Sequence, residues 1–155
     1  MVVKKLMDQD DHIIETLTAW FMDWWGTKEG FSKEKMQYYV KIHINPGQAL
    51  PQTFVLLQEE ELAGVYQLSM SDLDVRPDRY PWLINVYIAP TYRGQGGLTL
   101  MMESLKETMH SMKIPCVYLY TYHKGLYEKY GFQFVENFHT YINPDDIQRL
   151  YQYAP

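Results

Sequence analysis

The stretch INVYIAPTYRGQGGLTLMMESL, residues 84–105, constrains the fold more than any other part of the chain. An apolar, strand-like run ends at Pro90, and a basic loop with three glycines follows it. Apolar residues then repeat at the spacing of an amphipathic helix. Because a strand that feeds directly into a helix is typical of domains in which helices pack on a sheet, this unit predicts an α/β domain.

Hydrophobic periodicity predicts the other elements. Two amphipathic helices are expected before any strand, one at 11–25 with Asp10 or Asp11 as its N-cap and one that begins after Ser32 and stops before residue 45. The expected strands are 53–59 and 63–70, which form a hairpin, then 82–89, 116–122 and one or two strands within 132–142, with a short helix at 125–131. The order is αα-βββ-α-β-α-β, an α/β (α+β) domain with one mixed, mostly antiparallel sheet flanked by helices.

Length and charge narrow the class of protein. With 155 residues, of which 46% are apolar and 21% charged, residues 1–155 are expected to form a single domain. The N-terminus carries no apolar stretch of the length of a signal peptide or membrane span, and the single cysteine, Cys116, has no partner for an internal disulfide, so we expect a cytoplasmic protein without a membrane partner. A net charge of −5 argues against nucleic acid as a ligand.

Two familiar phosphate-binding motifs do not fit the glycine loop. A P-loop needs Lys and then Ser or Thr directly after its last glycine, but Leu98 follows Gly97. A dinucleotide fingerprint needs a third glycine at Thr99 and an early βαβ unit. Two interpretations remain. The loop is a plain strand-to-helix turn, or it directs the unpaired N–H groups at the start of the helix towards an anion, with Arg93 as an added positive charge.

The segment VYIAPTYRGQGG and the helix after it resemble the acetyl-coenzyme A signature of the GNAT superfamily of N-acetyltransferases. Arg93 and Gly96 occupy signature positions, whereas Leu98 stands where Gly or Ala is usual. A second match, GLYEKYGFQFVE at 125–136, resembles the late Tyr-containing helix and following strand of the superfamily. The resemblance implies a GNAT-like fold and acetyl-coenzyme A as co-substrate, with no metal.

The same resemblance implies which residues contact the coenzyme. Arg93 and Gly94 belong to the anion-binding loop, and Gln95, Gly96, Gly97, Leu98 and Thr99 would offer amides to the pyrophosphate. The backbone of Val86, Tyr87 and Ile88 would contact the pantetheine arm, which would leave this strand splayed from the next one. A primary amine of a small molecule would attack the thioester directly in a ternary complex, so Cys116 is not needed as a nucleophile.

Proton transfer in this chemistry needs an acid for the leaving thiolate and a base for the attacking ammonium. Tyr127 matches the superfamily's general acid, and the alternative is that Tyr127 is a packing residue. His123 stands near the place of a common Asn and either substitutes for it at the coenzyme or caps the helix. No base stands out, because Asn85 on the strand before the loop cannot accept a proton usefully. Asp72, Asp74, Glu103 and solvent are the candidates.

The acceptor is least defined. Residues 71–82 carry Asp72, Asp74 and Asp78 beside Arg76 and Arg79, so this loop either draws a cationic amine or clamps a substrate carboxylate. Aromatic residues that could line the site are Tyr80, Trp82, Tyr118, Tyr120 and Tyr122. The favoured hypothesis is an N-acetyltransferase, compatible with a homodimer. The alternatives are a non-catalytic acyl-coenzyme A binding module of the same fold and an interaction subunit that binds no coenzyme.

Overall fold

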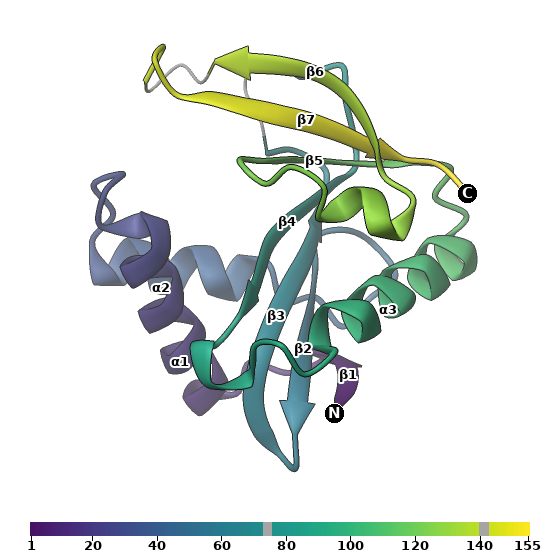
Figure 1. Cartoon of the computed structure of the whole chain (residues 1–155). Helices are drawn as coiled ribbons and strands as arrows, with labels where there is room; N and C mark the ends of the chain where they lie inside the picture. Colours follow the sequence, from purple (N-terminus) through teal and green to yellow (C-terminus); the bar gives the residue numbers. More distant parts are fainter. Residues whose placement is uncertain (73–75, 140–142) are drawn as a thin grey trace.

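The computed structural model describes residues 1–72, 76–139 and 143–155. These residues form one seven-stranded sheet in the order β1-β2-β3-β4-β5-β7-β6, antiparallel except for the β4–β5 pair. The strands are β1 (Val2–Lys5), β2 (Gln52–Gln58), β3 (Glu61–Ser69), β4 (Trp82–Ile88), β5 (Val117–Thr121), β6 (Gln133–His139) and β7 (Ile147–Tyr153). Helices cover both faces of the sheet (Figure 1). The predicted mixed, mostly antiparallel α/β fold is therefore confirmed.

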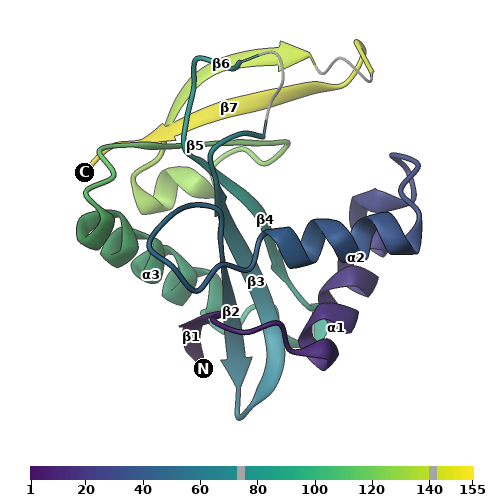
Figure 2. The same ribbon diagram turned by 180° about the vertical axis from the view of Figure 1, so that it is seen from behind.

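One face of the sheet carries α1 (Asp11–Phe21) and α2 (Lys33–Ile42), joined through a π-helical turn, η1 (Met22–Gly26) (Figure 2). The side chains of Asp10 and Ser32 cap the two helices, as the sequence predicted, by accepting hydrogen bonds from backbone amides three residues further on. The expected helix at 11–25 changes to π geometry after Phe21. This wider turn carries Trp24 and Trp25, both at least partly exposed, towards the open end of β4.

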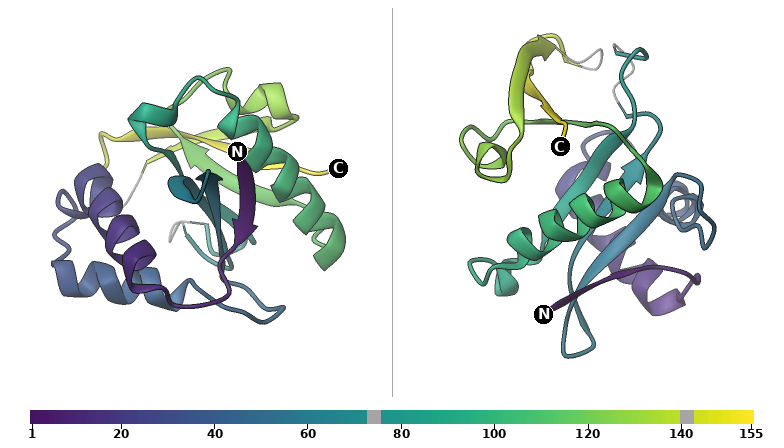
Figure 3. Two further views of the ribbon diagram at one scale, coloured as in Figure 1. Left: turned by 90° about the horizontal axis from the view of Figure 1, so that it is seen from below. Right: turned by 90° about the vertical axis from the view of Figure 1, so that its right-hand side faces the viewer.

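The opposite face is covered by α3 (Gly97–Met112), which follows a 3-10 turn, η2 (Pro90–Tyr92). The apolar stripe of α3 packs onto β2, β3 and β4 in the largest core cluster. Its fully buried members are Met101, Met102, Leu105 and Met109 from α3. Figure 3 shows the sheet edge-on between α3 and the α1–α2 pair. The amphipathic pattern after the glycine loop therefore predicted this helix and its buried face.

Three parts of the predicted order are wrong. The strand β1 precedes the helices, because its four residues are too few for a local pattern and are held by pairing with β2 far along the chain. The short helix expected at 125–131 is a single 3-10 turn, η3 (Tyr127–Tyr130). The last strand, β7, was missed because Gln148, Arg149 and Gln152 interrupt its apolar pattern, although it lies between β5 and β6. The end of the expected 132–142 segment, residues 140–142, lies outside the described residues.

The strands β4 and β5 meet at one end only. Trp82 and Tyr118 are their registered pair, and the Tyr118 amide donates to the carbonyl of Pro81 at 3.0 Å. Beyond this point the two strands diverge (Figure 1). The splay that the resemblance implied is confirmed, and it leaves the second half of β4 without a neighbour on that side. In the described part of the chain, no helix has the length and apolar character needed to cross a membrane.

Candidate functional site

A bulge in β4 marks the point where the splay begins. Val65 of β3 pairs with Tyr87 and Gln67 pairs with Ile84, so β4 has one more residue than β3 over this interval. Asn85 lies in the bulge with φ of 51°, in the left-handed region. The backbone of the predicted pantetheine stretch, Val86, Tyr87 and Ile88, follows directly, and these three residues are partly exposed. The bulge thus places partly exposed backbone beside the gap between β4 and β5.

The glycine loop begins where β4 ends, and its backbone is left-handed at Gly94 (φ 76°) and Gly96 (φ 84°). A Cβ at Gly96 would meet no atom within 4 Å, so the conformation rather than the space requires glycine there. The first helical amide bonded within α3 is that of Leu100, which donates to the carbonyl of Gly96 at 3.2 Å. Among the described residues, no side chain caps this end of α3. The amides of residues 97–99 therefore point out of the helix end, as an anion site requires.

Side chains hold this loop in place. Arg93 donates from Nε to the carbonyl of Ile88 at 2.7 Å, and its guanidinium lies 5.5 Å from the centre of the Tyr87 ring. Gln95 donates to the carbonyl of Thr91 at 3.2 Å. The positive charge of the exposed Arg93 therefore stays close to both β4 and the loop.

Gly97 and Leu98 join the loop to the core. A Cβ on Gly97 would lie 2.6 Å from Cδ2 of the fully buried Leu56, so glycine allows α3 to approach β2 closely. Leu98, which occupies the usual Gly or Ala position, is partly buried and packs against the same core cluster. Its side chain thus lies against the core, while its amide remains in the first turn of α3.

The structure places Tyr127 beneath the surface of η3. Its side chain is 6% exposed, and its ring meets the Phe132 ring edge-on with the centres 5.7 Å apart. Burial, and to a lesser extent the neighbouring Tyr130, raises the pKa of the Tyr127 hydroxyl. The hydroxyl of Tyr130 lies 3.1 Å from Oγ1 of Thr99, which links η3 to the first turn of α3. Tyr127 therefore keeps its proton at neutral pH, as a proton donor must.

His123 is exposed and lies in the bend after β5. Its amide donates to Oγ1 of Thr121, and its carbonyl accepts a hydrogen bond from the Tyr151 hydroxyl at 3.3 Å. The start of η3 has no side-chain cap on its own amides, and the carboxylate of Glu128 instead accepts from the amide of Gly125 at 3.1 Å. The alternative that His123 caps this turn is therefore wrong.

Asn85 is the centre of a polar cluster on the α1–α2 side of β4. Its Oδ1 lies 3.1 Å from the indole nitrogen of Trp25, and its Nδ2 lies 2.8 Å from the Tyr39 hydroxyl and 2.7 Å from Oε1 of Gln67. Gln67 also donates to Oγ1 of Thr53 at 3.1 Å. Tyr39 was not predicted as a site residue, because its place on an amphipathic helix is explained equally well by packing.

Negative charge surrounds Tyr39. Burial is the largest cause that raises the pKa of its hydroxyl, and the carboxylates of Asp72 and Glu29 add to it, while the hydrogen bond from Asn85 opposes it. Burial also raises the pKa of Glu29 itself. Asp72 is the only predicted base candidate that these interactions link to the cluster, since Glu103 is exposed on α3 and Asp74 lies outside the described residues.

The arginines of the loop before β4 already have partners. Arg76 donates from two nitrogens to the carboxylate of Asp78, at 3.1 and 3.2 Å, and also forms an ion pair with Glu136 of β6. Arg79 lies 3.7 Å from Asp78 and 5.3 Å from the centre of the Tyr118 ring. The alternative that these arginines clamp a substrate carboxylate is disfavoured. Asp78 is also compensated, so its contribution to the attraction of a cation is reduced.

Aromatic rings gather at the open half of β4. Tyr87 packs against Trp20 and Trp24, with ring centres 5.1 and 5.3 Å apart, and Trp24 is 41% exposed. Of the aromatic residues predicted to line an acceptor site, Trp82 and Tyr118 are buried at the closed end of the β4–β5 pair. Tyr120 is partly buried and contacts the Trp82 ring. Tyr80 and Tyr122 are exposed. Trp20 and Trp24 fall within the amphipathic helix expected at 11–25, and that pattern gave no sign of their place beside β4.

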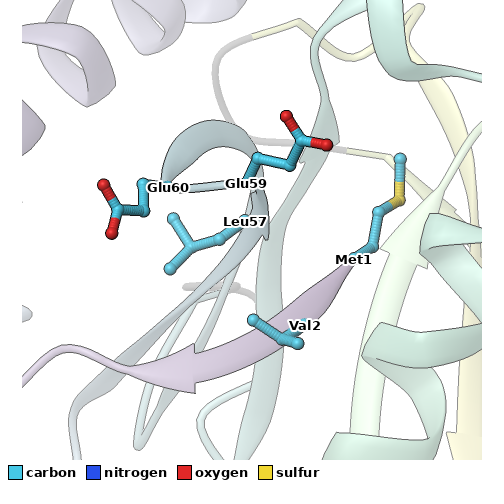
Figure 4. A pocket seen from close by; sticks show the side chains of 5 residues that line it. All are labelled: Met1, Val2, Leu57, Glu59 and Glu60. Atoms are coloured by element: carbon cyan, nitrogen blue, oxygen red, sulfur yellow. The ribbon is translucent and has the colours of Figure 1, made fainter.

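Recesses on the surface lie away from this cluster. One is lined by Met1, Val2, Leu57, Glu59 and Glu60, at the edge strand β1 and the tip of the β2–β3 hairpin (Figure 4). The side chains of Glu59 and Glu60 extend away from each other there, and the lining carries no basic group for a phosphate. Among the described residues, no group of three or more His, Cys, Asp or Glu side chains could hold a metal ion.

The chain is similar to known acetyltransferases, in sequence to their family model and in fold to solved structures. A family model described as an acetyltransferase (GNAT) domain matches residues 4–135. An aminoglycoside 6'-N-acetyltransferase solved with coenzyme A superposes with a TM-score of 0.74 at 14% identity, over 99% of this chain and 97% of that one. A spermidine N-acetyltransferase from Vibrio cholerae superposes with a TM-score of 0.72 at 16% identity, over 99% and 95% of the two chains. No curated protein matched the chain in sequence.

Proposed function

Because the chain belongs to the GNAT acetyltransferase family, we propose that it transfers an acetyl group from acetyl-coenzyme A to a primary amine of a small molecule. One observation carries the proposal: β4 pairs with β5 at Trp82 only, residues 85–88 of β4 are partly exposed, and the loop after it ends at the N-terminus of α3, whose amides have no side-chain cap in the described part of the chain. A long ligand with a phosphate at one end and an extended amide-containing arm fits this combination.

Different parts of the site would contact different parts of acetyl-coenzyme A. Amides of residues 95–99 and the charge of Arg93 would hold the pyrophosphate, because the first-turn N–H groups of α3 have no partner within the helix. Backbone groups of Val86 to Ile88 would pair with the pantetheine arm, as a neighbouring strand would. His123, exposed at the end of β5, would lie on the other wall of the gap.

The amine would attack the thioester carbon directly within a ternary complex, with no covalent acyl-enzyme. Cys116 forms its hydrogen bond with the Tyr118 hydroxyl, at the closed end of the β4–β5 pair, and takes no part in the proposal. As the sulfur departs, the Tyr127 hydroxyl would protonate it, because a thiolate with a pKa of about 8.5 is a weaker leaving group than the thiol. A phenol is protonated at neutral pH, and burial raises the pKa of Tyr127 further, so the hydroxyl carries its proton before the transfer.

The acceptor would be a cationic amine. Asp72 and Glu29 place negative charge near the bulge of β4, and Arg76 is paired internally. Structural neighbours include enzymes named for aminoglycosides and for spermidine, which are cationic amines of different kinds. The net charge of −5 favours the approach of such amines over acidic ones.

The test is release of the coenzyme A thiol from acetyl-coenzyme A, measured with a panel of polyamines, amino alcohols, amino sugars and amino acids. We expect turnover with cationic amines and an N-acetylated product, identified by mass spectrometry, in a one-to-one ratio with free thiol. Thiol release without an acetylated amine, or coenzyme binding without turnover on any amine, would contradict the proposal. The latter result would favour the non-catalytic acyl-coenzyme A binding module instead.

A further inference from the structure

In the polar cluster around Asn85, the donor and the acceptor of each hydrogen bond can be assigned from Trp25 at one end and Thr53 at the other. The indole N–H of Trp25 can only donate, so the atom that faces it must be the Oδ1 acceptor of Asn85. The amide nitrogen of Asn85 then faces Gln67 and Tyr39, and its two hydrogens serve these two partners. The orientation of the Asn85 side chain is thus fixed without reference to Tyr39.

Thr53, at the other end of the cluster, gives the same orientation of the Asn85 amide. Oγ1 of Thr53 donates its single proton to the backbone carbonyl of His43 at 2.6 Å, so it must accept from Nε2 of Gln67. Gln67 therefore presents Oε1 to Asn85, which again requires the amide nitrogen of Asn85 on that side. Both ends give one consistent assignment of donors and acceptors.

This assignment determines what the Tyr39 hydroxyl can do. Its hydroxyl oxygen accepts the hydrogen bond from Asn85, so its own proton is left to donate elsewhere. Within residues 1–72, 76–139 and 143–155, no acceptor takes that proton. Tyr39 and Asn85 are both partly exposed residues, and their hydrogen bond lies at the bulge of β4, where the proposed acceptor would bind. Tyr39 is thus a hydrogen-bond donor whose hydroxyl is held by Asn85, and Gln67 and Trp25 fix the orientation of the Asn85 amide.

The chemistry of the site limits what can accept this proton. An ammonium group has no lone pair, and a neutral amine needs its lone pair to attack the thioester, so the reacting nitrogen is excluded. A carboxylate is disfavoured because Asp72 and Glu29 already place negative charge near the Tyr39 hydroxyl. A neutral oxygen of the acceptor, from a hydroxyl or ether group, satisfies both conditions.

We propose that Tyr39 is a specificity-determining residue that selects cationic amines with a hydroxyl or ether oxygen near the reacting nitrogen, such as amino alcohols and amino sugars, over polyamines that lack oxygen. This inference rests on the proposed acetyl transfer and narrows its acceptor class. Asn85, Gln67 and Trp25 act through Tyr39 as positioning residues. When an oxygen-free polyamine displaces water from Tyr39, the Tyr39 proton has no acceptor. The unpaired donor weakens binding of the transition state and so lowers kcat/KM.

The test compares Tyr39→Phe with wild type on the best oxygen-bearing acceptor of the amine panel and on its deoxy analogue. We expect kcat/KM to fall about 3- to 10-fold for the oxygen-bearing acceptor, the range for one neutral hydrogen bond. The deoxy analogue should be acetylated at the wild-type rate or somewhat faster, because Phe leaves no unpaired proton, so the selectivity between the two should largely disappear. Tyr38→Phe is the matched control, because Tyr38 is 67% exposed on the same helix, and it should keep the wild-type selectivity.

A second variant keeps the hydroxyl and removes its free proton. In Asn85→Asp the new carboxylate only accepts, so it takes the proton of Tyr39. We expect the same loss of selectivity as in Tyr39→Phe. Selectivity that survives both variants would overturn the inference, as would a best acceptor without oxygen. An equal loss on both amines in Tyr39→Phe would also overturn it and would assign the hydroxyl to the thioester. If no amine is acetylated by the wild type, the proposed function fails and this inference fails with it.

Discussion

Tyr127 shows how a single residue can be assigned by resemblance and located only by the structure. Its position in GLYEKYG matches the superfamily's acid, but its sequence alone fits a packing residue equally well. The structure places it under η3 against Phe132, where burial raises its pKa. Tyr39 had no such signal, because it contacts Trp25 of η1 and Asn85 of β4, and local periodicity carries no information about contacts between separate elements.

At the residue scale, the proposed acid is tested by Tyr127→Phe, which removes one hydroxyl and almost no volume. We expect turnover to fall by about 10²- to 10⁴-fold, the usual contribution of a general acid, while coenzyme binding is retained. The measurement is thiol release, with coenzyme affinity from calorimetry. Tyr130→Phe removes a neighbouring hydroxyl that contacts Thr99, and turnover should stay close to wild type. A Tyr127→Phe enzyme with wild-type turnover would return Tyr127 to a packing role.

At the scale of elements, the unit from β4 to α3 was predicted well because its signals are local. The strand ends at a proline, the loop needs glycine at left-handed positions, and the stripe of α3 repeats through four turns. Strand β1 was missed because its position depends on a distant partner, β2, and strand β7 was missed because polar residues interrupt its apolar pattern. Gly64 illustrates the same limit: a Cβ there would lie 2.8 Å from the carbonyl of Tyr87, a closeness between β3 and β4 that the sequence does not reveal.

The end of α2 gives a prediction about pH. His43 follows the last residue of this helix, is 7% exposed, and lies with Nδ1 2.7 Å from the carbonyl of Tyr39. Burial lowers the pKa of His43, and the hydrogen bond to that carbonyl opposes the change only in part. The folded protein therefore binds fewer protons than the unfolded chain below a pH of about 6.5, and the free energy of unfolding decreases as the pH falls through that value.

We expect the Tm to decrease between neutral pH and pH about 5 and His43→Asn to reduce this dependence, since the Asn amide can replace Nδ1 but does not titrate. His110→Asn is the control, because His110 is exposed on α3, and the slope should remain that of wild type. Scanning calorimetry over this pH range makes the measurement. An unchanged slope in His43→Asn would show that other groups cause the loss of stability.

At the scale of the whole molecule, the proposed coenzyme site and the polar cluster around Asn85 lie on opposite faces of β4. The glycine loop and α3 lie on one face of β4, and Tyr39, Trp25 and Asn85 lie on the other. Between these faces, β4 pairs with β5 at Trp82 only and diverges from it beyond that point. The sequence predicted the fold class and, through resemblance, the splay. The sequence could not predict the polar cluster around Asn85, because its residues come together only when α2, η1 and the sheet pack against one another.

The central claim is that the gap between β4 and β5, with the amides at the start of α3, binds the coenzyme. Amide hydrogen exchange with and without coenzyme A tests it most directly, in wild type and in Gly96→Val, where a β-branched residue must adopt the left-handed conformation (φ 84°). Gly30→Val is the matched control, since Gly30 has φ of 79° and equally open surroundings. Coenzyme A should slow exchange at residues 86–88 and 95–99 in wild type and in Gly30→Val, but not in Gly96→Val. Protection that appears instead around Met1, Glu59 and Glu60, or no protection at all, would contradict the claim.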